Sequence, residues 1–498
     1  MAPWFGQSSM VVYSLCTWSL EGSDMLSKTD FIQYLNCPKS LWLKQHKPDV
    51  YPEGEFSDFA QKLAAEGYQV EGYVRQLVKE WPDAASCSFQ DVFETNEGLH
   101  ARADMLRENE DGTIDIFEIK SSTSVKDGKP HNQLKDAAFQ TIAATRAGRD
   151  VRNIFIVHLN KDYVRDGEID PGGLLTFADE TIRVKGLLDE TEREIAEALS
   201  LLGEAAIDES SCTCLNLSRL HHCDSFDYFN PGIPEYSIYS LPRLFGRKLE
   251  NFVAEGRFGL DQIELDEVSR LQQPIVRAHN IENPYVDLAD IENFIGALAY
   301  PLYFLDYETY LSAIPVVDGT GPQQQLPFQF SLHVLHEDGR VDHVEYLADR
   351  PELPRPLVEA LEGAVGANGS VVTWNKTFEN ARNNEMGQAF PDKRDFLLGL
   401  VDRTVDLMDV FKTGYVDIRF NGSTSIKKVL PVVVPELSYE GMEIGDGTAA
   451  MDGWNKMINE TDPQKQARLR QALLEYCKLD TLAMVRIFQF VEGLVRGG

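Results

Sequence analysis

The chain has 498 residues, which at roughly 100–200 residues per domain is too long for one ordinary core and predicts two large domains with connecting structure. Its 43% hydrophobic and 25% charged residues exclude a disordered or fibrous protein, and no apolar run reaches the roughly 18–20 residues that cross a bilayer. The net charge of −32 argues against broad adhesion to phosphate backbones, although cations bound to catalytic carboxylates would neutralise part of it.

The first 25 residues carry little pattern and no basic leader before their mildly apolar stretch. The first helix-start signal follows directly, in Leu26-Ser27-Lys28-Thr29-Asp30. We therefore interpret residues 1–25 as an N-terminal extension, with Met25 as an alternative start of translation, and we expect a cytoplasmic protein without a membrane-bound part.

A pair of strands is predicted between Leu99 and Lys120, where LHARADML and TIDIFEIK flank a polar turn. Period-two alternation places Glu118 and Lys120 on one face, and Asp104 is expected near the end of the first strand. Two carboxylates could hold Mg²⁺ or Mn²⁺ while the lysine orients or deprotonates a water that attacks a phosphodiester. Such a trio, taken alone, is more often solvated surface, so its context decides.

That context is a helix after the lysine, with apolar residues from Leu134 to Thr145 at helical spacing and Gln140 among them, and then the strand NIFIVHL from Asn153. The order Asp104, Glu118-x-Lys120 and a helix with Gln140 resembles the RecB type of PD-(D/E)xK nucleases. The resemblance implies a restriction-endonuclease-like fold over residues 26–230, with these four as catalytic residues and with Asp104 and Glu118 as metal ligands.

The cysteines extend this resemblance. Cys37 lies upstream of the nuclease-like core, and Cys212, Cys214 and Cys223 follow it, in the one-then-three order of RecB-type nucleases with an iron-sulfur cluster. Four thiolates can hold a 4Fe-4S cluster that joins the two ends of the domain. Zn²⁺ is the alternative, with His221 or His222 able to replace one thiolate. With seven cysteines and no export signal, disulfides are not expected.

Residues 231–292 are interpreted as a bridging segment, because the sequence there becomes rich in proline, glycine and aromatic residues and then weakly periodic and acidic. Short helices are expected from Leu241 to Val253 and from Asp261 to Arg270. Stacking of its aromatic residues on nucleic acid is one reading, but packing between the two large domains is favoured.

The C-terminal domain, residues 293–498, opens on PLYFLDYETY, a buried strand in which Asp306 and Glu308 point the same way. Two carboxylates in an apolar strand repel each other and lose hydration, and a divalent cation would remove both penalties. Strands are expected at Pro327–Leu335, Val341–Leu347 and SVVTWN, with a helix near Leu357 between the last two.

A helix carrying Phe378 and Glu379 is expected next, and a long helix from about Gln464 to Val495 carries Tyr476 and Asp480, four apart and so on one face. The strands with their closing helix fit a ribonuclease H-like fold, so the whole chain is predicted to be of the α/β class with two domains.

Asp306-x-Glu308, the N-x-x-F-E element and Tyr476-x-x-x-Asp480 resemble the DEDD exonucleases that use a tyrosine. The resemblance implies that the four acids hold two metal ions for 3′-5′ exonuclease action and that Tyr476 positions the water. Glu379 departs from the usual aspartate, and its extra methylene shifts the carboxylate, so the C-terminal site is expected to be the weaker of the two. The segment FNGSTSIKKVLP has either phosphate-binding chemistry or a simple helix cap.

From LSKTDFIQYLNCPKSLWL to YCKLDTLAMV the chain resembles an uncharacterised bacterial family that joins both nuclease-like domains. The resemblance implies a metal-dependent nuclease acting on DNA, and the likeness to RecB-type cluster nucleases in general implies a role in repair, recombination or defence. The chain has no Walker-type loop, so a helicase or another repair or defence protein would be a separate partner. Two alternatives remain: a nuclease with one live site, acting on DNA or RNA, whose other domain clamps nucleic acid, and a non-catalytic scaffold.

Overall fold

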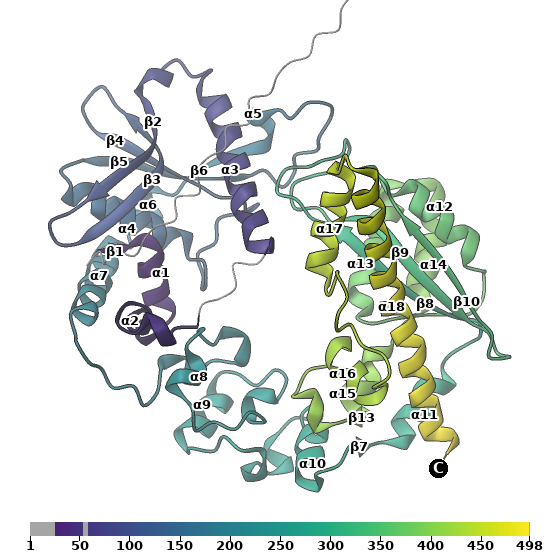
Figure 1. The fold of residues 1–498 in the computed structure, drawn as a ribbon. Helices are drawn as coiled ribbons and strands as arrows, with labels where there is room; N and C mark the ends of the chain where they lie inside the picture. The colour runs from purple at the N-terminus through teal and green to yellow at the C-terminus, as the bar shows by residue number, and fades with distance from the viewer. Residues whose placement is uncertain (1–24, 53–57, 498) are drawn as a thin grey trace, which may run out of the picture.

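The computed structural model describes residues 25–52 and 58–497, and the proposed N-terminal extension falls outside this range except for Met25. The fold is mixed α/β, with one large sheet in each half of the chain (Figure 1). The predicted α/β class is therefore confirmed. Among the described helices, none is both long and apolar enough to cross a membrane.

The N-terminal half is built on a six-stranded mixed sheet. β3 pairs with β2, β1 and β4, β4 pairs in parallel with β5, and β5 pairs antiparallel with β6. The strands are β1 (Leu26–Ser27), β2 (Cys87–Glu94), β3 (Leu99–Glu108), β4 (Ile114–Ile119), β5 (Val151–Leu159) and β6 (Leu175–Asp179). The two strands expected between Leu99 and Lys120 are confirmed, but β3 extends to Glu108, so Asp104 lies inside it rather than near its end.

Helices cover both faces of this sheet because its central strands alternate apolar side chains. Ile116 packs with α1, α4 and α7 on one face, and its neighbour Phe117 packs with α3 on the other. The helices are α1 (Lys28–Asn36), α2 (Pro38–His46), α3 (Asp58–Val78), α4 (Gln133–Arg146), α5 (Pro171–Leu174), α6 (Thr181–Lys185) and α7 (Leu188–Leu202). Glu118 shares the face of Ile116 and so lies beneath α1 and α4.

The segment between the sheets forms its own small core with few regular elements. Its helices are α8 (Phe226–Phe229), α9 (Arg247–Ala254) and α10 (Gln273–Ile281). The helix expected from Asp261 to Arg270 is wrong, because this stretch forms two single 3-10 turns, Leu260–Gln262 and Leu265–Glu267. The side chains of Gln262 and Glu267 each bond back to the backbone three residues earlier, which closes each turn on itself.

The C-terminal half contains a five-stranded sheet in the order β10-β9-β8-β11-β12. β8 lies in the middle, antiparallel to β9 and parallel to β11. The strands are β8 (Leu302–Tyr310), β9 (Leu326–Leu335), β10 (Val341–Leu347), β11 (Ser370–Thr373) and β12 (Thr404–Asp406), while β7 (Tyr285–Val286) pairs with β13 (Tyr415–Val416). The strands expected here are confirmed, with the last one ending at Thr373.

Both faces of this sheet are again covered. Phe304 of β8 packs with α18 and α16, whereas its neighbour Leu305 packs with α12 and α14. The helices are α11 (Leu288–Gly296), α12 (Arg355–Ala364), α13 (Lys376–Ala389), α14 (Arg394–Asp402), α15 (Val410–Thr413), α16 (Ile426–Val433), α17 (Gly447–Asn459) and α18 (Pro463–Arg496). The expected long closing helix is α18. Asp306 and Glu308 share the face of Phe304, so they point toward α18.

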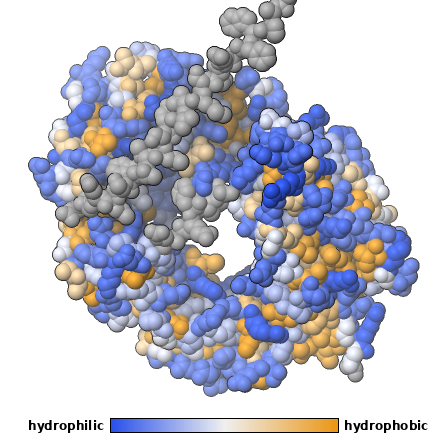
Figure 2. Space-filling view, viewed as in Figure 1, coloured by the Kyte–Doolittle hydropathy of each residue, from blue (hydrophilic) through white to orange (hydrophobic). Residues whose placement is uncertain are grey.

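The two halves touch each other away from the bridging segment. The loop that follows β8 places Ala313 and Ile314 in the apolar cluster formed by α3 and the first sheet. Backbone hydrogen bonds between Arg165 and the Gly319–Thr320 turn add to this contact. With the bridging segment at the other end, the chain encloses an opening, which is visible between the halves in Figure 2.

Candidate functional sites

Glu118 is the centre of a buried polar group in the N-terminal half. Its side chain is 1% exposed, and its Oε1 atom accepts from Lys120 Nζ at 2.5 Å and from Lys28 Nζ at 2.8 Å. Its Oε2 atom accepts from Gln140 Nε2 at 2.5 Å. The two lysines and the amide lower the pKa of Glu118 in spite of its burial, so the carboxylate is ionised.

Two aspartates complete this group. Asp136 of α4 pairs with Lys120 at 2.8 Å and accepts from Gln140 at 3.1 Å, while Asp104 accepts from the backbone N–H of Ile119 at 2.8 Å. Burial and the charge of Glu118 raise the pKa of Asp104 to about 7. The structure thus places all four residues proposed from the sequence in one group.

Lys28 and Asp136 belong to this group and were missed by the sequence reasoning. Asp136 had a signal, because it precedes Gln140 by four positions on a helix and therefore shares its face. Lys28 had none, since only the tertiary fold brings the first turn of α1 to β4. Carboxyl groups therefore outnumber lysines in this group by three to two, a composition compatible with a cation site.

The four cysteines named from the sequence converge at the edge of the N-terminal half. The Sγ atoms of Cys37, Cys212, Cys214 and Cys223 all lie within 4.8 Å of one another. Cys37 comes from the junction of α1 and α2, and the other three come from the segment after α7. The other three thiols lower the pKa of the Cys212 thiol, because they hydrogen-bond to its sulfur. This donor set could hold a metal ion or an iron-sulfur cluster, since thiolates are the preferred ligands of both.

The two histidines considered as substitutes are engaged elsewhere. The ring of His222 stacks on Phe226 with centroids 3.5 Å apart and hydrogen-bonds the carbonyl of Leu217, and His221 hydrogen-bonds Ser218. Burial lowers the pKa of His222. Within the described residues, the ligand group therefore consists of four thiols without a histidine.

A second acidic group lies under α18 in the C-terminal half. Carboxylate oxygens of Asp306 and Glu308 and the sulfur of Cys477 lie within 4.8 Å of one another. The pairing of β8 with β9 is irregular at Glu308–Thr309, a local distortion of the kind that re-aims side chains near functional sites. Cys477 is not among the residues proposed from the sequence, although it precedes Asp480 by three positions on α18 and so shares its face.

Asp480 and two tyrosines close this group from the side of α18. Burial raises the pKa of Asp480 to about 6, against hydrogen bonds from Tyr439 and Tyr476, of which the Tyr439 hydroxyl donates at 2.6 Å. Burial and the carboxylates raise the pKa of both phenols, so they remain protonated donors. Tyr439 was not identified from the sequence, and nothing in its local pattern distinguishes it.

Glu379 faces the same group from α13. It is 2% exposed, and its Oε2 atom has no hydrogen-bond partner among the described residues. Burial and the charge of Asp306 raise its pKa. Burial likewise raises the pKa values of Asp306 and Glu308, and the charge of Asp480 adds to this for both, with that of Asp306 acting on Glu308 as well. A divalent cation would offset the repulsion and the burial together, so the arrangement is one that could hold metal.

Lys427 of α16 is a basic residue that acts on Glu308 and Asp480, whereas the charge of Arg382 acts on Glu379. Its Nζ atom donates to the carbonyl of Gly445 at 2.7 Å and lies 5.6 Å from the ring centroid of Tyr476 and 5.7 Å from that of Tyr439. Its charge lowers the pKa values of Glu308 and Asp480. A cavity of about 300 Å³, lined by Glu308, Gln325 and other residues of this half, opens beside the acids.

Comparison with known proteins gives no activity. A family model described as a domain of unknown function, DUF2779, matches residues 303–425, which include Asp306, Glu308 and Glu379. The uncharacterized protein MG366 of Mycoplasma genitalium is 25% identical over 242 residues, which are 44% of this chain and 36% of that protein. Its homolog in Mycoplasma pneumoniae is 27% identical over 215 residues, 39% of this chain and 32% of that protein. The chain thus spans about a third of the length of these relatives.

A solved structure, titled "Crystal structure of SSO0001", aligns with 36% of this chain and 79% of its own. The sequence identity is 14% and the TM-score is 0.24, which is too low to carry an argument about the fold.

Proposed function

We propose that this protein is a metal-dependent nuclease that hydrolyses phosphodiester bonds in DNA. The observation that carries the proposal is the set of buried carboxyl groups around Asp306. Their pKa values stay raised, so the basic side chains of the described residues do not fully compensate for their burial and repulsion. A protein retains such a costly arrangement where a bound cation and its chemistry require it.

For the C-terminal half we propose a ribonuclease H-like fold and a DEDD-type exonuclease site. The strand order β10-β9-β8-β11-β12 supports this, with Asp306 and Glu308 on the central strand and Asp480 on the helix packed against it. Asp306, Glu308, Glu379 and Asp480 would hold Mg²⁺ or Mn²⁺. When bound, the metal supplies an activated water and stabilises the developing charge on the phosphate.

This chain's own residues then bind and orient the reactants. The protonated Tyr476 hydroxyl hydrogen-bonds the attacking water, whose oxygen forms the new bond to phosphorus as the bond to the 3′ oxygen breaks. The Lys427 ammonium faces the developing negative charge from the α16 side. The attacking water gives up one proton to solvent and the leaving 3′ oxygen takes one from solvent, so the products are a 5′-mononucleotide and a shortened strand.

For the N-terminal half we propose a PD-(D/E)xK restriction-endonuclease-like fold and a second site. Asp104 and Glu118 would hold the cation, Lys120 would orient the water, and Gln140 fixes the second oxygen of Glu118. The Lys28 ammonium shares the Oε1 atom of Glu118 with Lys120, so it must leave that oxygen before a cation binds there.

For the four cysteines we propose a structural metal centre, either a 4Fe-4S cluster or Zn²⁺. The sulfur separations fit a single tetrahedral ion directly, and a larger cluster would require the side chains to move apart. In both cases the centre would tie the start of the domain, at Cys37, to its end.

The proposal is tested by incubating end-labelled single-stranded and duplex DNA with the full chain and Mn²⁺ or Mg²⁺. Lys120→Ala, Asp306→Ala and the double variant are compared with the exposed control variants Lys126→Ala and Asp402→Ala. Stepwise loss of cleavage, with both controls active, is the expected result. If the folded, metal-supplied wild type cleaves neither DNA nor RNA, the proposal is overturned and a scaffold role takes its place.

A second candidate has one live site, and the charge pattern favours the C-terminal one. Glu118 is already neutralised by two lysines, whereas Glu379 has an unpartnered oxygen. In that case Asp306→Ala alone abolishes cleavage, and Lys120→Ala only weakens binding of nucleic acid. This reverses the expectation from the sequence, in which Glu379 made the C-terminal site the weaker of the two.

A further inference from the structure

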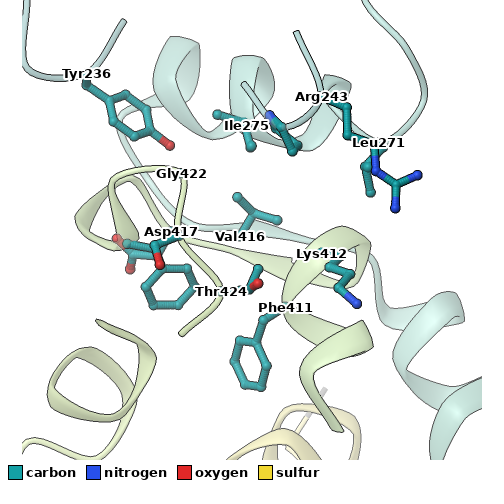
Figure 3. Close-up of a pocket in the computed structure, with 13 residues that line it drawn as sticks. Tyr236, Arg243, Leu271, Ile275, Phe411, Lys412, Val416, Asp417, Gly422 and Thr424 are labelled. Carbon is teal, nitrogen blue, oxygen red and sulfur yellow. The ribbon is translucent and has the colours of Figure 1, made fainter. Parts of the chain in front are cut away.

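A cavity of about 320 Å³ lies between the bridging segment and the C-terminal half, away from all three candidate sites. Figure 3 shows it from the inside, with α10 and the segment around Tyr236 on one side and the Phe411–Thr424 region on the other. Leu271, Ile275, Phe411 and Val416 form its apolar body. Its volume is at the lower end of the range of about 300–1,000 Å³ for small-molecule sites.

One end of this cavity carries an unsatisfied donor. The Tyr236 hydroxyl is buried and has no hydrogen-bond partner among the described residues. Burial and the charge of Asp417 raise the pKa of Tyr236, so the phenol keeps its proton. The Asp417 carboxylate itself is occupied by the guanidinium of Arg419, at 2.6 and 3.0 Å. A ligand that offers an acceptor to Tyr236 would therefore remove a buried polar penalty.

The other end is basic. In Figure 3, Tyr236 lies at the left end of the cavity and Arg243 and Lys412 lie at the right end. Arg243 adopts a left-handed backbone conformation, with φ of 56°, and its guanidinium makes no ion pair or hydrogen bond to any described residue. Lys412 pairs with Asp409 at 2.7 Å. An unpaired guanidinium at the mouth of an apolar cavity is suited to a phosphate or carboxylate group.

We propose that this cavity binds a nucleoside monophosphate. The base would lie among the aromatic and aliphatic side chains and accept a hydrogen bond from Tyr236, while the phosphate would bind Arg243. An apolar, partly aromatic body with a donor at one end and a guanidinium at the other matches a planar base joined to one phosphate, and the volume suits one nucleotide rather than a chain of them.

The position of the cavity links it to the acids of the C-terminal half, a step that rests on the proposed function. Gly422, Ser423 and Thr424 line the cavity, and Lys427 follows three residues later on α16. Gly422 has φ of 69°, and a Cβ atom there would lie 2.2 Å from the carbonyl oxygen of Ser240, so this turn is packed tightly against the bridging segment. A bound mononucleotide, the product of exonuclease action, would fix the turn and thereby regulate the placement of Lys427.

The binding step is tested by titration calorimetry of the full chain with dAMP, AMP, adenosine and inorganic phosphate, in excess EDTA so that metal-dependent binding at the acids is absent. Saturable binding of a nucleotide is expected, with adenosine and phosphate each at least tenfold weaker. Arg243→Ala should weaken nucleotide binding at least tenfold, and Tyr236→Phe should weaken it severalfold. Ile275→Trp should abolish it by filling the cavity. Lys248→Ala, an exposed basic neighbour outside the cavity, is the matched control.

The proposal is overturned if the folded wild type binds neither nucleotide, if phosphate alone binds as tightly, or if Arg243→Ala and Tyr236→Phe both bind like the wild type. Regulation is read separately, as a change in DNA cleavage on adding dAMP that Arg243→Ala removes. If the chain binds the nucleotide but cleaves no nucleic acid, the nucleotide site is supported and the proposed nuclease function is rejected. The failure of one proposal can therefore be distinguished from the failure of the other.

Discussion

The side-chain amide of Gln323 donates a hydrogen bond to the backbone carbonyl of Ser121 at 3.0 Å. Ser121 directly follows Lys120, and Gln323 belongs to the loop that starts just after Glu308 and Thr309. In the same loop, Gln325 accepts a hydrogen bond from Thr309 and lines the cavity beside Glu308. One loop therefore contacts the residue next to Lys120 and also lines the cavity beside Glu308, so a movement of one half relative to the other would reach the surroundings of both acidic sites.

The apolar anchor of this loop is expected to hold the halves together. Ile314 is 7% exposed within a cluster that belongs mainly to the N-terminal half. Ile314→Asp buries a charge without a partner there, which costs about 3 kcal/mol or more, so the contact should open. Small-angle X-ray scattering should then give a larger radius of gyration than for the wild type. The control is Val341→Asp, at a position 40% exposed, which should leave the radius of gyration unchanged. An unchanged radius for Ile314→Asp would show that this loop does not hold the two halves together.

Strand and helix positions were largely predictable, because the spacing of apolar residues distinguishes the two: every second residue in a strand and every third or fourth in a helix. Ile116 and Phe117 pack on opposite faces as a two-residue period requires, and α18 follows its helical pattern over nearly its whole length. The error at residues 261–270 also has a local cause. Gln262 and Glu267 bond to nearby backbone groups, and this competes with continuing a helix.

The candidate sites were predictable only where their members share an element or a motif. Glu118 and Lys120 are two apart on a strand, and Tyr476 and Asp480 are four apart on a helix, so their spacing places them together. Lys28, Tyr439 and Lys427 join these groups through tertiary packing between segments far apart in the chain. The spacing of residues along the sequence cannot predict these tertiary contacts.

Lys427 should contribute to nuclease action at the C-terminal site without being required for folding. Lys427→Ala removes the cation that faces the acids from α16, and a reduction in cleavage rate of about 100-fold is expected, as for loss of one electrostatic stabiliser. Lys428→Ala changes the exposed neighbour and should cleave like the wild type. Both variants should unfold at similar temperatures. Equal rates for the two variants would exclude a role for Lys427 in the reaction.

The cysteine group should make stability depend on a metal. Cys214→Ser removes one of four ligands, so the metal bound per chain should fall from one centre to a small fraction, and the melting temperature should drop by several degrees. Elemental analysis for iron and zinc, with the visible spectrum, identifies the centre. Cys87→Ser, at a cysteine outside the group, should retain full metal content. Wild-type protein that purifies with neither iron nor zinc and gains no stability from them would contradict this.

Two histidines on neighbouring strands should make the protein less stable in acid. Burial lowers the pKa of His333 to about 3 and that of His343 to about 4, and each ring bonds a hydroxyl, of Thr481 and Ser331 respectively. The unfolded chain binds these protons near pH 6.5, whereas the folded chain does not. The free energy of unfolding is therefore unaffected by these two rings above about pH 6.5. It decreases as the pH falls toward 4, by at most about 1.4 kcal/mol per pH unit for each ring.

The comparison that isolates this effect uses urea unfolding between pH 7 and pH 4.5. His343→Gln should flatten the pH dependence of the free energy of unfolding relative to the wild type. His336→Gln, in the same hairpin, replaces a ring that pairs with Asp342 and serves as the control. If His343→Gln and the wild type lose stability in parallel, the buried ring is not the source of the acid sensitivity.

Removing a carboxylate from the C-terminal acids should stabilise the protein while it abolishes activity. Burial, together with the charges of neighbouring acids, raises the pKa values of Asp306 and Glu308, and Asp306→Asn removes one of these carboxyl groups with almost no change in shape. In EDTA the free energy of unfolding of the variant should exceed that of the wild type by about 1–2 kcal/mol, within the range for relieving one poorly satisfied buried polar group. Mn²⁺ should reverse the order, because it stabilises the wild type through binding and the variant much less. Thermal unfolding with and without Mn²⁺ measures both effects, and Asp402→Asn should respond like the wild type in each condition. If the wild type gains no stability from Mn²⁺, these acids do not hold a metal, and the burial of several carboxyl groups together has a different explanation.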